Sequence, residues 1–275
     1  MRGGVEKLID TSWQNVLFAF SLTLFAGLST SVGSLFAFFT KTMSEKFLAL
    51  SLGFSAGVMI YISFVEILAG AQESLKIVYG GQQGEFIAML SFFGGMALIF
   101  LINKFISIQP RKWSKIARSE TNRDNQQLIR TGVLSALAIA IHNFPEGIAT
   151  FITALDDPTL GVSMAIAIAI HNIPEGIAVS VPIYYATKSK KQAFLYSFLS
   201  GLAEPLGAII GFIFLMPFLN QTVLGIIYAM IAGIMVYISL DELIPTATKY
   251  GGSQTVTQGM IGGMVVMGAS LMLLS

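Results

Sequence analysis

The chain has 275 residues, of which 54% are hydrophobic and only 11% are charged, and its formal net charge is +1. Its mean hydropathy of +0.74 lies far above that of soluble domains, so the composition favours a polytopic membrane protein and leaves no room for a large soluble domain. The small net charge gives no reason to expect a nucleic-acid partner, and the absence of cysteine excludes disulfides and thiolate metal sites.

Eight apolar segments are long enough to cross a bilayer, which takes about 20 residues of helix. We therefore predict an all-α fold in which residues 1–275 form a single transmembrane domain. The N-terminal stretch lacks the pattern of a cleaved signal peptide, so we expect the first helix to be retained. The predicted helices cover residues 13–39, 46–72, 86–106, 131–153, 160–186, 192–216, 223–244 and 256–274.

Basic residues are distributed unevenly between the connections. Thirteen of the 16 Lys and Arg residues fall in the connections after helices one, three, five and seven. Because short basic connections stay on the cytoplasmic side, both termini are expected outside. The longest connection, residues 104–130, is basic and polar, and we interpret it as a cytoplasmic loop.

Six acidic residues fall inside the predicted helices, whose interiors contain no Lys or Arg. An ionisable side chain at the bilayer centre costs about 2.5–3.5 kcal/mol on insertion scales, so it faces protein or water and normally has a partner. With no basic partner encoded, the carboxyl groups are protonated, or they line water, or they bind a cation. The six residues are Glu66, Glu146, Glu175, Glu204, Asp241 and Glu242.

The fourth and fifth helices carry the strings HNFPEGIA, at residues 142–149, and HNIPEGIA, at residues 171–178. In each copy a histidine stands four residues before a glutamate, which places both side chains on one helix face. Imidazole, carboxylate and amide oxygen suit a borderline divalent cation such as zinc, iron, manganese, cobalt or nickel. The alternative is that these groups only form hydrogen bonds between helices. The candidate ligands are His142, Asn143, Glu146, His171, Asn172 and Glu175.

Prolines accompany three of the intramembrane glutamates. Pro145 and Pro174 cannot donate to the carbonyl group four residues earlier, so each is expected to kink its helix beside the ligands. In the sixth helix Pro205, which we also predict to kink its helix, follows Glu204, and we assign Glu204 as a bridging or gating carboxylate.

An internal repeat relates the second helix to the seventh. Residues 56–68 align without gaps on residues 232–244 with seven identities in 13 positions. The two helices cross in opposite directions, as do the fourth and fifth, which predicts a 3+2+3 inverted repeat of the kind found in secondary transporters. Glu66 corresponds to Glu242, and with Asp241 these acids could attract an ion at the two ends of its route. The alternative is that they are helix-end carboxylates in water.

The paired strings, together with SFVEIL upstream and DELIP downstream, resemble the ZIP family of divalent metal transporters, and most closely its bacterial ZupT branch. The resemblance covers nearly the whole chain. It implies eight helices, both termini outside, a bacterial inner-membrane location, and transport toward the cytoplasm by a four-helix unit that slides against the rest. Residues 104–130 contain none of the histidines that many members carry in that loop.

The resemblance also implies a binuclear metal site. One ion would be held by His142, Glu146, His171 and Glu175. A second ion would be held by Asn143, Asn172 and Glu204, which would share Glu146 and Glu175 with the first.

The resulting expectation is a secondary transporter that imports Zn²⁺, and also Fe²⁺, Mn²⁺, Co²⁺ or Cd²⁺, with no prosthetic group. Divalent metal ions and the lipid bilayer are the expected partners, and a homodimer is compatible with the sequence. Two rivals stay open, a metal-ion channel and an integral-membrane metallohydrolase in which the same residues would hold zinc to activate water.

Overall fold

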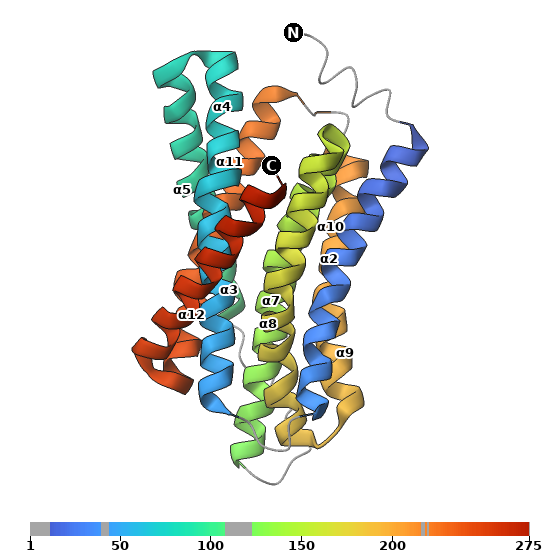
Figure 1. Ribbon diagram of the computed structural model, residues 1–275, viewed down its shortest axis with the longest axis vertical. Helices are drawn as coiled ribbons and strands as arrows, with labels where there is room; N and C mark the ends of the chain where they lie inside the picture. Colours follow the sequence, from blue (N-terminus) through green and yellow to red (C-terminus); the bar gives the residue numbers. More distant parts are fainter. Residues whose placement is uncertain (1–11, 40–43, 108–122, 216–217, 219, 275) are drawn as a thin grey trace.

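A computed structural model describes residues 12–39, 44–107, 123–215, 218 and 220–274, which are almost entirely helical and contain no strand (Figure 1). The predicted all-α fold is confirmed. The elements are α2 (Trp13–Phe39), α3 (Glu45–Ile62), η1 (Ser63–Ile67), α4 (Leu68–Tyr79), α5 (Gly81–Ser107), α7 (Arg123–Asp156), α8 (Pro158–Thr187), α9 (Lys190–Gly201), α10 (Ala203–Ile210), η3 (Gly211–Leu215), α11 (Gln221–Ile238), η5 (Ser239–Leu243) and α12 (Ile244–Leu274).

Short polar side chains mark where several helices begin. Ser44 Oγ accepts a hydrogen bond from the Phe47 N–H at 3.2 Å, and Asn220 Oδ1 accepts one from the Val223 N–H at 2.9 Å. Asp157 caps α8 by accepting from two backbone N–H groups, and Pro158 follows at the first helical position. Such caps satisfy backbone donors that have no partner inside the helix, so they fix the points where the chain turns.

Six stretches of the described residues are long and apolar enough to cross a membrane. The last of them, Gln221–Leu273, has 53 residues and would be about 80 Å long if straight, which is too long for one crossing. Gly252, at φ 73°, breaks the helix inside this stretch. Helix α7 is not among the six stretches, and several of its side chains lie outside the described residues. Eight crossings therefore stay a prediction.

The surface of these helices carries large apolar side chains. Phe25, Phe93 and Phe100 are about half exposed, and Val265 is exposed to 65%. Water would not favour so much exposed apolar area, whereas lipid chains solvate it without cost. The exposed residues thus mark the faces expected to contact the bilayer.

Helical structure extends into both ends of the predicted cytoplasmic loop at residues 104–130, which stays a prediction. Helix α5 continues to Ser107, and α7 is already helical from Arg123. Polarity marks where the membrane ends, but glutamine, leucine and arginine are good helix formers, so a helix can continue into water. The remainder of the predicted loop, residues 108–122, lies outside the described residues.

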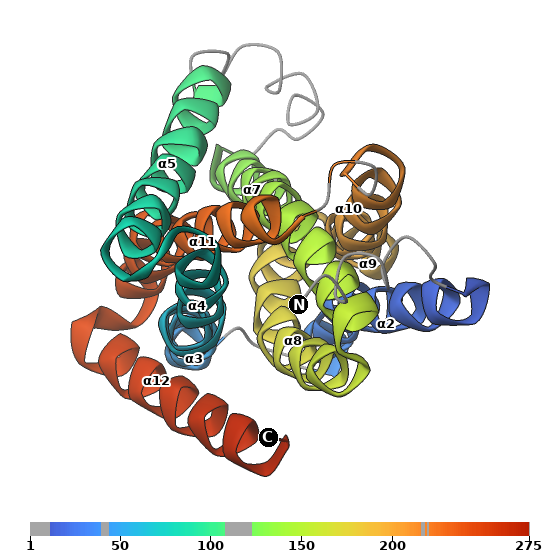
Figure 2. The ribbon, with the colours of Figure 1, turned by 90° about the horizontal axis from the view of Figure 1, so that it is seen from above.

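The helices form two bundles that lie side by side in both views (Figures 1 and 2). The α8 bundle contains α2, α7, α8, α9 and α10, and the α3 bundle contains α3, α4, α5, α11 and α12. Packing is dense within each bundle. Between them the main contact is α3 against α8, with smaller contacts of α11 with α7 and of α12 with α8.

Two glycines bring helices of the α8 bundle into direct backbone contact. A Cβ atom at Gly147 of α7 would overlap the Glu204 carbonyl oxygen of α10, and one at Gly176 of α8 would overlap the Thr30 carbonyl oxygen of α2. Close approach of this kind needs the smallest residue at the contact. Each glycine directly follows the glutamate of a repeated string, so these contacts place the candidate ligands at helix crossings.

Candidate metal centre

The two repeated strings lie in α7 and α8, which pack against each other, and α10 brings Glu204 to the same region. The side chains of five of the six predicted ligands in these strings are described. Each of the five has an exposed fraction of 1% or less, and Glu204 is buried to the same degree. The five are Asn143, Glu146, His171, Asn172 and Glu175. The sixth, His142, has its backbone in α7, but its side chain lies outside the described residues.

A histidine from one string meets a glutamate from the other. His171 Nε2 lies 3.4 Å from Glu146 Oε2. The contact joins α8 to α7, so the repeated strings do face each other across the helix pair. At this distance the two atoms could be bridged by one cation, since Zn²⁺ binds imidazole nitrogen and carboxylate oxygen at about 2.0–2.2 Å.

Asn172 connects the α7–α8 pair to α10 and α2. Its Nδ2 group donates to Glu204 Oε1 and, at 2.9 Å, to the Ala26 carbonyl oxygen. The carboxyl groups of Glu146 and Glu175 both lie close enough to Glu204 to act on it electrostatically. Three glutamates are therefore gathered in one buried region.

Several polar atoms in this region have no hydrogen-bond partner among the described residues. They are both side-chain polar atoms of Asn143, Glu146 Oε1, Asn172 Oδ1 and Glu204 Oε2. Buried polar atoms are nearly always paired, and leaving one unpaired costs about 1–3 kcal/mol. Four of these five atoms carry oxygen lone pairs, which is the arrangement that a divalent cation would satisfy.

Among the described residues no Lys or Arg forms an ion pair with Glu146 or Glu204. Lys76 pairs with Glu85 at 2.6 Å, far from this centre along the sequence. Within the described part of the chain no three His, Asp or Glu side chains converge as a ready metal cage. The described part of the centre includes the contact between His171 and Glu146 and a separate contact between Asn172 and Glu204.

The prolines have different settings. Pro145 and Pro174 lie inside α7 and α8, which stay helical around them, and the predicted kinks stay predictions. Pro205 stands in the first turn of α10, where the chain is interrupted at Leu202. Because proline cannot donate to the carbonyl group of Gly201, four residues earlier, it accounts for the end of α9 at that residue.

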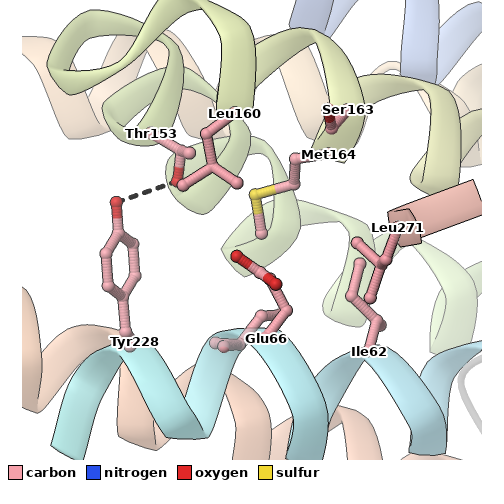
Figure 3. A pocket seen from close by; sticks show the side chains of 10 residues that line it. Ile62, Glu66, Thr153, Leu160, Ser163, Met164, Tyr228 and Leu271 are labelled. Atoms are coloured by element: carbon pink, nitrogen blue, oxygen red, sulfur yellow. Dashed lines mark hydrogen bonds between the residues drawn. The ribbon is translucent and has the colours of Figure 1, made fainter. Parts of the chain in front are cut away.

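Glu66 lies in a different place, a mainly apolar pocket between the two bundles (Figure 3). Its carboxyl group points toward Thr153 and Met164 of the α8 bundle, and it is half-buried. At one side of the pocket the hydroxyl groups of Thr153 and Tyr228 share a hydrogen bond of 2.9 Å. The pocket thus joins α3, η1 and α11 to α7 and α8.

Asp241 and Glu242 lie outside the buried glutamate cluster as well. They occupy η5, where Asp241 is exposed and Glu242 is partly exposed. Glu66 occupies the corresponding turn η1, 176 residues earlier, which is the offset of the sequence repeat. Both turns are π-helical, a rare geometry that often occurs at functional sites.

Sequence reasoning missed Ser55. Its hydroxyl group lies 3.2 Å from Glu175 Oε1 and 3.4 Å from the His171 carbonyl oxygen, and it comes from α3 in the other bundle. Serines are common in the apolar helices of this chain, so no sequence pattern separates this one from those that bond only to their own helix.

Comparison with known proteins identifies the class. The family model described as ZIP zinc transporter matches residues 109–275, and the chain belongs to the ZIP family of transporters. Membership makes it a multi-pass membrane transporter rather than an enzyme, so the metallohydrolase interpretation is set aside.

The relatives include proteins named zinc transporter ZupT. The one from Oceanobacillus iheyensis is 56% identical, with 95% of this chain and 99% of that protein covered. The one from Chlorobium chlorochromatii is 55% identical, with 94% and 98% covered. The one from Streptococcus mutans is 54% identical, again with 94% and 98% covered. The resemblance to the ZupT branch is confirmed.

Proposed function

We propose that this chain imports zinc, and also iron, manganese, cobalt or cadmium as divalent ions, into the cytoplasm. The observation that carries the proposal is the buried group of three glutamates beside His171, in which oxygens of Glu146, Glu204 and the two asparagines have no hydrogen-bond partner among the described residues. Buried negative charge of this kind is stable only with a positive partner, and a divalent cation supplies one.

The centre is proposed to hold two ions. His142, Glu146, His171 and Glu175 would bind the first, and the 3.4 Å contact between His171 and Glu146 supports this grouping. Asn143, Asn172 and Glu204 would bind the second while sharing Glu146 and Glu175. The hydrogen bond from Asn172 to Glu204 and the proximity of Glu204 to both shared glutamates support the second group.

We also propose eight crossings in a 3+2+3 inverted repeat. Gly147 and Gly176 stand 29 residues apart in the two strings, and their backbone partners, Glu204 and Thr30, stand 174 residues apart. The symmetry of the inverted repeat that relates α7 to α8 would therefore also relate α10 to α2. The π-helical turns η1 and η5, which lie 176 residues apart, also support the repeat.

The transported ion would pass between the α3 bundle and the α8 bundle. The pocket around Glu66 is the proposed outer entrance, and Asp241 and Glu242 would attract the ion at the inner end. Sparse contact between the bundles would allow the α8 bundle, which carries the ligands, to slide along α3. The inward membrane potential would drive uptake, at about 2.3 kcal/mol per charge per 100 mV.

The orientation can be tested with single cysteines, because the chain has none of its own. We expect a membrane-impermeant maleimide on intact spheroplasts to label Gln82→Cys, at the start of α5, and to leave Lys191→Cys, at the start of α9, unlabelled until the membrane is opened. Both residues are exposed on the surface of the fold, so a difference in labelling would report the side of the membrane and not burial. The reverse labelling pattern would place the termini inside.

Uptake can be tested in liposomes that hold the purified protein and a metal-sensitive dye. We expect zinc uptake without ATP, saturating with zinc concentration and accelerated by an inside-negative potential. Cadmium, cobalt, iron and manganese should compete, because His, Glu and Asn ligands accept several such ions. Flux that grows linearly with concentration at every potential would favour the channel alternative.

A further inference from the structure

Ser55 connects the α3 bundle to the candidate metal centre. The residue is fully buried, and its hydroxyl group can donate to Glu175 Oε1, at 3.2 Å, or to the His171 carbonyl oxygen, at 3.4 Å. A serine has one proton to donate, so it serves one of the two acceptors at a time. The carboxylate is both the nearer and the more strongly accepting of the two when ionised.

Ser55 and Glu175 are each fixed to their own bundle. On one side of Ser55, Gly53 allows α3 to approach the Val256 carbonyl oxygen of α12 so closely that a Cβ atom would lie 2.6 Å from it. Glu175 directly precedes Gly176, whose Cα lies against the α2 backbone. The hydrogen bond therefore joins two positions that move relative to each other only if the bundles move.

We propose that Ser55 is a positioning residue that makes cation affinity depend on how the two bundles are aligned. In the alignment seen here the serine holds one oxygen of Glu175 and orients the carboxylate for the cation. Displacement of α8 along α3 by one helical turn, about 5.4 Å, would break this hydrogen bond. Glu175 would then bind the cation less tightly, which favours release. The inference rests on the proposed transport function.

The test compares two buried serines of the same membrane stretch. Ser63 is also fully buried but donates to the Met59 carbonyl oxygen of its own helix. Ser55→Ala is expected to raise the KM for zinc uptake about 3- to 10-fold, as for loss of one hydrogen bond of ordinary net strength, with the maximal rate within about twofold. Ser63→Ala should leave both quantities within about twofold. An unchanged KM in Ser55→Ala, or the same rise in Ser63→Ala, overturns the proposal.

A second measurement asks whether Ser55 acts through Glu175. Zinc affinity is obtained from the zinc-dependent rise in the thermal unfolding temperature of the detergent-solubilised protein. If Ser55 acts through Glu175, Ser55→Ala combined with Glu175→Gln should bind zinc as weakly as Glu175→Gln alone, because coupled residues are not additive. A further loss in the double variant would overturn the proposal.

The outcomes separate this inference from the function on which it rests. If the unaltered protein shows no saturable zinc uptake, the proposed function and the role of Ser55 both fail. If the unaltered protein takes up zinc and Ser55→Ala keeps the same KM, only the role of Ser55 fails.

Discussion

Replacing Glu146 with glutamine is expected to lower the rate of saturable zinc uptake by about a hundredfold or more while the protein still folds. Outer-shell partners of a metal already contribute 10- to 100-fold to affinity, and a directly bound carboxylate should contribute at least as much. Glu146 stands at the centre of the proposed site, since Oε2 lies 3.4 Å from His171 and Oε1 has no partner among the described residues. Glutamine keeps the shape and removes the charge. Initial uptake rates into dye-loaded liposomes measure the effect.

The matched control is Glu73→Gln. Glu73 is exposed in α4 and distant in sequence from every predicted ligand, so its substitution should change uptake by less than twofold. Thermal unfolding of both variants separates loss of transport from loss of folding. Zinc uptake that persists in Glu146→Gln at the unaltered rate would remove the proposed metal site.

Gly147→Ala is expected to destabilise the fold by about 1–3 kcal/mol or more, the usual cost of inserting a methyl group where there is no space. The added Cβ atom would overlap the Glu204 carbonyl oxygen, and backbone cannot move aside as a flexible side chain can. The α7–α10 contact would have to open, which also displaces Glu204 from its position beside Asn172. The midpoint of thermal unfolding in detergent should fall, and zinc uptake should fall with it.

Gly70→Ala provides the comparison, because no atom lies within 4 Å of a Cβ atom at that position in α4. Alanine there should be neutral or stabilise by about 0.5–1 kcal/mol through its better helix propensity. If Gly147→Ala unfolded at the same temperature as Gly70→Ala, the close contact between α7 and α10 would be wrong.

The paired strings explain why the centre could be predicted in part. The sequence predicts that His171 and Glu146 lie near each other, because the same string occurs on two helices. A repeated set of ligand residues indicates a shared site even before the helix packing is known. The partners of Asn172 could not be predicted, because the Ala26 carbonyl group is backbone that every residue has. The contact of Ser55 with Glu175 could not be predicted for a similar reason, since it depends on which helix lies opposite Ser55.

Helix ends were predicted less well than helix centres. Apolar composition reports which residues prefer lipid, and it located the central part of each helix. It does not report where hydrogen bonding along the backbone stops, so α5 and α7 extend beyond the predicted ends of their spans. The interruption at Leu202 was likewise not foreseen, although Pro205 was assigned as a kink.

The π-helical turn η1 changes which neighbouring helices the segment from α3 to α4 packs against. A turn wound with an additional residue rotates everything after it by about 100° relative to an unbroken α-helix. Upstream of it, α3 faces α12 and α8, and downstream, α4 faces α5 and α11. The π-helical turn therefore lets one continuous helical segment pack against different helices on its two sides. Glu66 lies in the turn itself, where the packing face changes.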